Sequence, residues 1–159
     1  MRTQIIDSIR KWILFFMIAL AVSGITAFPV HKELHWIINS GLAVPGTAIG
    51  NWLLEVWRGV DAAQQDFPFL FYGFDWLAFA HIMIALLFIG VYKNPVQNKW
   101  IIDWAMLCCV CIWPLAFICG SIRGIPLLHI LVDCSFGVVG LLPLWIVKKK
   151  ISKLENGKN

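Results

Sequence analysis

The sequence predicts an all-α fold: a polytopic membrane protein with four transmembrane helices and one interfacial amphipathic helix, forming a single integral membrane domain over residues 1–159. Of these 159 residues, 60% are hydrophobic and only 14% are charged. Soluble domains contain about 45–50% apolar and about 25% charged residues, so this chain would expose too much apolar surface in water. Four apolar stretches also approach the length of about 20 residues that crosses a hydrocarbon core of about 30 Å.

The first predicted span covers about residues 12–30 and ends near Pro29, because proline disfavours continuation of a helix. Its basic lead, apolar centre and small residues before Phe28 also fit a cleaved signal peptide. The small-x-small pattern is poor, however, because Ile25 stands third from the end of a cut after Ala27. We therefore expect an uncleaved anchor, and cleavage would leave three spans with the same orientation.

The stretch between the first and second spans, about residues 31–73, is the one long hydrophilic excursion. An amphipathic helix is predicted at about residues 47–64, because its apolar residues recur at spacings of three and four. They are Ile49, Trp52, Leu53, Val56, Trp57 and Val60, with Asn51, Glu55, Arg58 and Asp61 on the other face. Such a helix is expected to lie flat in the outer headgroup region, or alternatively to cover the bundle as a lid.

The remaining three spans are predicted at about residues 74–92, 100–119 and 126–147. A cluster of aromatic residues from Phe67 to Trp76 marks the outer start of the second span, as aromatic belts do at membrane interfaces. Lys93, Asn94 and Pro95 form a tight turn between the second and third spans. A short turn from Gly120 to Pro126 joins the third and fourth spans, with the proline in the first turn of the last helix.

The orientation follows from the lysine and arginine residues, which accumulate on the cytoplasmic side of membrane proteins. With both termini in the cytoplasm, ten basic residues are inside and three are outside. The inside residues are Arg2, Arg10, Lys11, Lys93, Lys99, Lys148, Lys149, Lys150, Lys153 and Lys158; the outside residues are Lys32, Arg58 and Arg123. The predicted location is therefore a bacterial inner (cytoplasmic) membrane, with several passes and both termini cytoplasmic.

Five charged or imidazole side chains lie in the outer parts of these spans or at their outer ends: Asp75, His81, Arg123, His129 and Asp133. Asp103 stands apart, near the inner end of the third span. A charged group at mid-membrane costs about 2.5–3.5 kcal/mol on insertion scales, so such groups usually have a partner or a function. At 1.5 Å per helical residue, all five fall in the outer half of the membrane. The spacing predicts that they gather in an outward-facing polar pocket.

The facing of these residues supports the same pocket. His129 and Asp133 are four residues apart and share a helix face with the small residues Gly137 and Gly140. Small residues mark the faces on which membrane helices pack. Ala78, His81 and Ala85 form a second small stripe. Asp75 is about 120° around its helix from His81, so the alternative expectation for Asp75 is a pair with Arg123 at the surface.

We expect this pocket to bind a small ligand, a lipid headgroup or a proton, since histidine titrates near neutral pH and arginine suits a carboxylate or phosphate. The alternative is a buried polar network that fixes helix register without chemistry. An enzyme is less expected than a binding protein. No catalytic residue is assigned, because no nucleophile motif accompanies the histidines and aspartates.

Two further functions remain open. One is a b-type haem-binding redox subunit of a membrane complex, with His81 and His129 as axial ligands. Their depths differ by about 5 Å, and no haem attachment motif is present. No cofactor is therefore expected, and haem b is the alternative. The other is an intramembrane enzyme that modifies a lipid or isoprenoid, using histidine and aspartate as acid and base.

Metal sites, disulfides and nucleic-acid binding are not expected. His31 and His35 share a helix face but lack a third ligand, so they are interpreted as interfacial residues. The five cysteines, Cys108, Cys109, Cys111, Cys119 and Cys134, all lie in predicted spans and serve as small packing residues. The expected partners are the lipid bilayer and other membrane subunits or a second copy in a homodimer; no basic surface with interleaved aromatics predicts nucleic acid.

Overall fold

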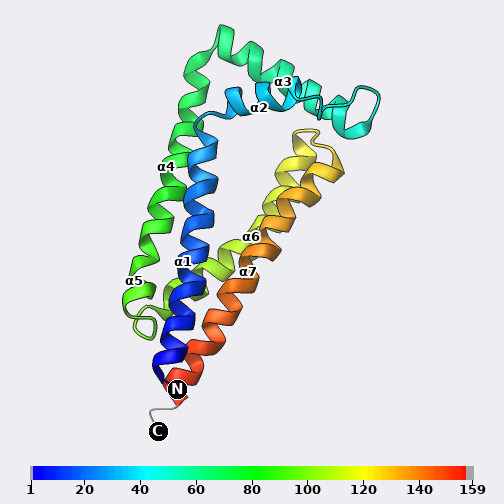
Figure 1. Cartoon of the computed structure of the whole chain (residues 1–159). Helices are drawn as coiled ribbons and strands as arrows, with labels where there is room; N and C mark the ends of the chain where they lie inside the picture. The colour runs from blue at the N-terminus through cyan, green and yellow to red at the C-terminus, as the bar shows by residue number, and fades with distance from the viewer. Residues whose placement is uncertain (1, 157–159) are drawn as a thin grey trace. The chain divides into compact units, whose positions relative to one another are not determined.

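The computed structural model describes residues 2–156, which are helical with no strand (Figure 1). In chain order the elements are α1 (Arg2–Ala27), α2 (Val30–Asn39), α3 (Ala48–Asp66), the short 3₁₀ helix η1 (Pro68–Phe71), α4 (Tyr72–Leu87), α5 (Ile89–Lys93), α6 (Lys99–Ile122) and α7 (Leu127–Asn156). The predicted all-α class is confirmed, and each predicted span falls on observed helix.

Three helices of the described chain are long and apolar enough to cross a membrane: Pro68–Lys93, Lys99–Ile122 and Leu127–Asn156. A fourth is counted if α1 and α2, which are bent by 83° at the break between them, are taken as one span. The break lies at Pro29, as its backbone chemistry predicts. Length and composition therefore support three spans, or four with the bent pair.

The chain divides into two compact units, which are described separately. The hairpin unit comprises Met1–Ala19 and Ala85–Asn159, and the α2–α3 unit comprises Leu20–Ile84. Among its described residues, the core of the hairpin unit is mainly aliphatic, and Phe88 is its aromatic member. Its fully buried large side chains are Ile9, Ile13, Phe88, Val91, Ile102, Leu144, Val147 and Ile151.

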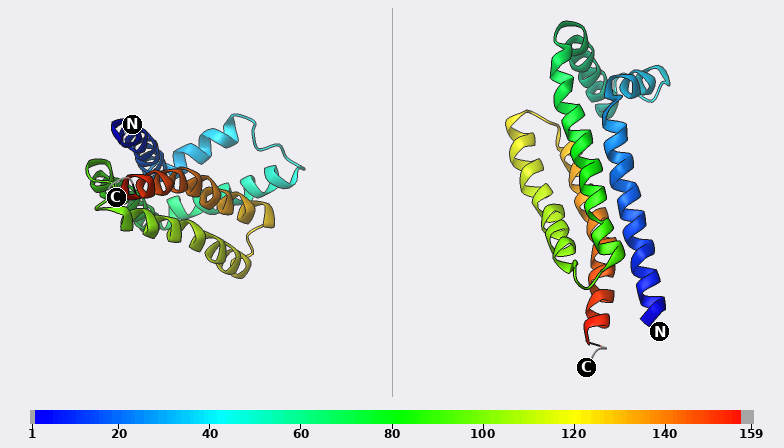
Figure 2. Two further views of the ribbon diagram at one scale, coloured as in Figure 1. Left: turned by 90° about the horizontal axis from the view of Figure 1, so that it is seen from below. Right: turned by 90° about the vertical axis from the view of Figure 1, so that its left-hand side faces the viewer.

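Within the hairpin unit, α6 and α7 lie side by side over much of their length (Figure 2). Gly137 and Gly140, the small residues of the predicted packing face on α7, allow this contact. A Cβ atom added to Gly137 would lie 2.6 Å from the carbonyl oxygen of Cys109, and one added to Gly140 would lie 2.9 Å from the Cys109 Sγ. The prediction that this glycine stripe is a packing face is confirmed.

Two ion pairs link the N-terminal part of α6 to the C-terminal part of α7. Lys148 Nζ lies 2.7 Å from Asp103 Oδ1, and Lys99 Nζ lies 2.8 Å from Glu155 Oε2. Asp103 is thereby paired with a lysine of the basic run that follows the fourth predicted span. Helix α7 accordingly continues through this run to Asn156.

In the α2–α3 unit, α2 packs against α3 (Figure 1). Helix α3 begins at Ala48 because the side-chain oxygen of Thr47 accepts a hydrogen bond from the Gly50 backbone N–H at 3.0 Å. The second half of α1 packs on α4 at Gly24. A Cβ there would lie 2.8 Å from the Ala78 carbonyl oxygen, so the predicted stripe of Ala78 and His81 is also a packing face.

Candidate functional site

Three of the predicted site residues line one groove in the hairpin unit, next to the α6–α7 turn. Arg123 follows α6, while His129 and Asp133 lie in the first two turns of α7. The groove has a volume of about 310 Å³. Its remaining wall is largely apolar and consists of Ile112, Leu115, Ala116, Cys119, Gly120 and Ile125.

The turn that places Arg123 is set by glycine. Gly124 has φ +68°, in the left-handed region that favours glycine. Its N–H donates to the Ser121 carbonyl at 3.3 Å, while the Ile125 N–H donates to the Gly120 carbonyl at 2.9 Å. These two hydrogen bonds together form the Schellman motif, which ends a helix by satisfying its last carbonyl groups. Arg123 is thereby held at the C-terminal end of α6, where a cation is favoured by the helix dipole.

His129 and Asp133 face each other along α7. The Nε2 atom of His129 lies 3.8 Å from Oδ1 of Asp133, and their side chains are 45% and 43% exposed. This distance exceeds that of a hydrogen bond but permits an ion pair when the imidazole is protonated. Because both groups are partly exposed, each can reach a ligand in the groove. The arrangement supplies a guanidinium, an imidazole and a carboxylate to one space.

His81 lies in the α2–α3 unit. Its Nδ1–H donates a hydrogen bond to the Leu77 carbonyl oxygen at 2.8 Å, one turn earlier on α4. A neutral imidazole that donates from Nδ1 presents Nε2 as an acceptor. The Cβ atom of His81 lies 2.9 Å from the position that a Cβ on Gly24 would take, so the backbone of α1 covers the base of the side chain.

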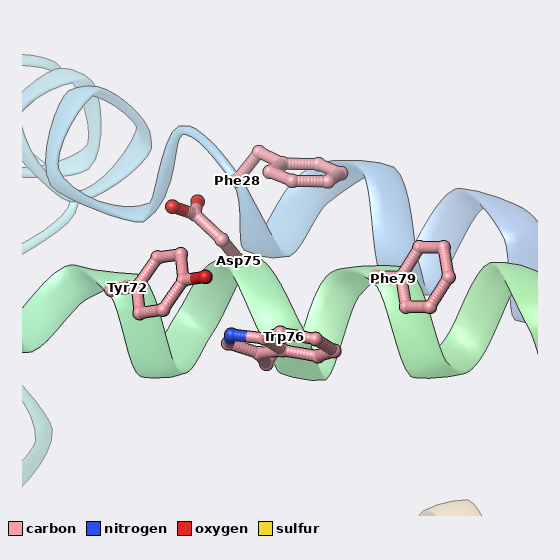
Figure 3. Close-up of a pocket in the computed structure, with 5 residues that line it drawn as sticks. All are labelled: Phe28, Tyr72, Asp75, Trp76 and Phe79. Carbon is pink, nitrogen blue, oxygen red and sulfur yellow. The ribbon is translucent and has the colours of Figure 1, made fainter.

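Asp75 lies in the first turn of α4 and lines a separate pocket of about 320 Å³ in the α2–α3 unit. The other lining residues are Phe28, Tyr72, Trp76 and Phe79. Figure 3 shows the carboxylate directed toward the chain at the end of α1, beside Phe28, with Trp76 on the opposite side of the α4 ribbon. The helix dipole favours an acidic group at this position.

The five predicted residues thus fall into two sets. Arg123, His129 and Asp133 share a groove, whereas His81 and Asp75 belong to the other unit. Three expectations stay predictions: a single pocket that joins both sets, a pair between Asp75 and Arg123, and a haem site between His81 and His129.

A histidine–aspartate pair that the sequence interpretation missed links α2 and α3. His31 Nε2 lies 2.9 Å from Asp61 Oδ1, and Gln65 donates to Asp61 Oδ2 at 2.8 Å. His31 and His35 lie against the ring of Trp57, with centroids 5.1 Å and 5.3 Å away. Both histidines share one face of α2, so their four-residue spacing was the sequence signal for a common contact surface. The spacing does not indicate which helix packs against that surface.

In the part of the chain that the structure describes, no three His, Cys, Asp or Glu side chains are grouped to hold a metal ion. Comparisons with known protein families, with curated proteins and with solved structures find no match to this chain.

Proposed function

We propose that this chain is a multi-pass membrane protein that binds a small anionic group in the groove of Arg123, His129 and Asp133. In this proposal four spans cross a bacterial inner membrane, both termini are cytoplasmic, and the α6–α7 turn faces outward. The observation that carries it is the convergence of these three polar side chains on one groove between otherwise apolar helices.

The chemistry of the groove favours a carboxylate or phosphate. A planar guanidinium forms two parallel hydrogen bonds to either group. The imidazole of His129, which also lines the groove, supplies a further N–H donor. The apolar wall, including Leu115 and Ala116, suits a ligand whose anionic group is attached to a hydrocarbon part, as in a fatty acid or lipid headgroup.

The amphipathic helix supports the membrane placement. On α3, Trp52 and Trp57 are half-buried while Glu55 and Arg58 are exposed, so the polar face is the open one. Tryptophan rings are enriched at membrane interfaces. We propose that α3, together with α2, lies at the outer membrane surface.

The groove contains its own reporter, Cys119, which is exposed and lines it. The experiment measures the rate at which N-ethylmaleimide alkylates this thiol in the detergent-purified chain, resolved by peptide mass spectrometry. Inorganic phosphate and benzoate are the probes. Both are expected to slow alkylation of Cys119 in a saturable way, while Cys111, which is exposed outside the groove, serves as the internal control.

Arg123→Gln is expected to weaken this protection at least about tenfold, because a hydrogen bond to a charged group contributes about 1.5–3 kcal/mol. Arg58→Gln removes the same charge from exposed α3 and is the matched control. Equal loss in both variants, or no protection of the wild-type thiol by either probe, would overturn the proposal.

A further inference from the structure

A second groove lies near the C-terminal end of α7 in the hairpin unit, away from the α6–α7 turn. Its volume is about 690 Å³. Met106 of α6 lines one part, and α7 supplies Trp145, Lys148, Lys149, Ser152 and Lys153. The α7 residues follow spacings of three and four, so they form one continuous stripe along the helix.

The charges in this groove are unbalanced. Asp103 neutralises Lys148 across the hairpin at 2.7 Å. The Nζ atom of Lys149 lies 3.5 Å from the centre of the Trp145 ring, a cation–π contact that holds the ammonium without neutralising it. Lys153 adds another positive charge at the last turn of α7. Two ammonium groups therefore line the groove without a carboxylate on them in the described contacts.

The same stripe becomes apolar toward the middle of the helix. Leu142, one turn before Trp145, is 59% exposed, and Val138 is also exposed. On α6, Leu107 beside Met106 is exposed as well. A ligand in this groove thus contacts lysine ammonium groups at one end and a hydrocarbon surface at the other.

We propose that this groove binds the phosphate headgroup of an anionic phospholipid, with Lys149 and Lys153 on the phosphate and an acyl chain along Trp145 and Leu142. Basic pockets between membrane helices on the cytoplasmic side recognise such headgroups. A soluble phosphate compound would use the lysines alone and leave the apolar stripe uncovered. The inference rests on the proposed membrane placement but not on the Arg123 groove.

The experiment is native mass spectrometry of the full chain released from detergent after incubation with cardiolipin, phosphatidylglycerol or phosphatidylcholine. The wild type is expected to retain the two anionic lipids, and phosphatidylcholine at least several-fold less. Lys149→Gln and Lys153→Gln are each expected to weaken retention about fivefold, the fold-change that corresponds to about 1 kcal/mol per basic residue near anionic lipid.

Lys150→Gln is the matched control, because this neighbouring lysine carries the same charge but does not line the groove. An equal loss in Lys150→Gln would show attraction by bulk charge and overturn the site. Displacement of the lipid by millimolar inorganic phosphate would identify a free anion as the occupant and overturn the lipid assignment. If the wild-type chain retains the lipid but neither probe protects Cys119, only the Arg123 groove is rejected. If a probe protects Cys119 but the chain retains no anionic lipid, only the lysine groove is rejected.

Discussion

His31 and Asp61 join α2 to α3 through a hydrogen bond of 2.9 Å between Nε2 and Oδ1. Their side chains are 29% and 33% exposed, so the pair is shielded from water more than the His129–Asp133 pair of the proposed groove. The Trp57 ring lies against the same imidazole. This pair therefore connects two helices that also meet where the His35 ring lies against Trp57.

Replacement of Asp61 by Asn is expected to loosen α2 from α3 by about 1 kcal/mol, the upper range for a partly exposed ion pair. Hydrogen exchange of the α2 amides in detergent measures the change, and protection should fall in α2 while α6 is unaffected. Asp66→Asn, at the exposed end of the same helix, is the matched control. Unchanged α2 protection in Asp61→Asn would contradict the pairing.

Replacement of Gly137 by Ala is expected to destabilise the α6–α7 contact by about 1–3 kcal/mol, because the added methyl group would overlap the Cys109 carbonyl oxygen. Thermal unfolding followed by circular dichroism measures the loss. Gly59→Ala is the control, since a Cβ there meets no atom within 4 Å and alanine favours the helix. A melting temperature of Gly137→Ala at or above that of wild type would show that the helices separate without cost.

Replacement of Gly124 by Ala is expected to cost about 1–2 kcal/mol, because alanine is strained at a positive φ. The strain falls on the turn that places Arg123, so phosphate protection of Cys119 should weaken as well. Gly73→Ala, in open space within α4, provides the comparison. If Gly124→Ala is less stable but phosphate still protects Cys119 fully, the conformation of this turn is not needed for binding in the groove.

Exchange of Asp103 and Lys148 tests the ion pair at the opposite end of the hairpin. Asp103→Lys alone is expected to lower the melting temperature, because two lysines then face each other, and adding Lys148→Asp should restore much of the loss. The pair is about half exposed, so its contribution is at most about 1 kcal/mol. Additive losses in the double variant would show that the two residues do not interact.

The number of crossings determines where the termini lie. Helix α1 has 26 residues and is about 39 Å long, enough to cross a core of about 30 Å by itself. Four spans place both termini on one side, whereas three place them on opposite sides. Reporter fusions at each end, alkaline phosphatase for the outside and a fluorescent protein for the cytoplasm, are expected to locate both ends in the cytoplasm.

The helices could be predicted from the sequence because their signals are local. Proline at position 29, glycine at position 124 and the apolar periodicity of residues 47–64 each act within a few residues, and the helix breaks follow them. The pairing of His129 with Asp133 was also within reach, since four residues separate them. The contacts His31–Asp61 and Lys148–Asp103 join distant segments, and nothing in either segment specifies its partner.

The turn after Ile122 also bears on how the chain assembles. Only four residues separate α6 from α7, so the two helices meet without closing a long loop. Contacts between near neighbours in the sequence form fast. During synthesis α6 and α7 can pack together as soon as α7 leaves the ribosome. The packed pair then provides a surface against which the earlier segment of the same unit, the first half of α1, can pack.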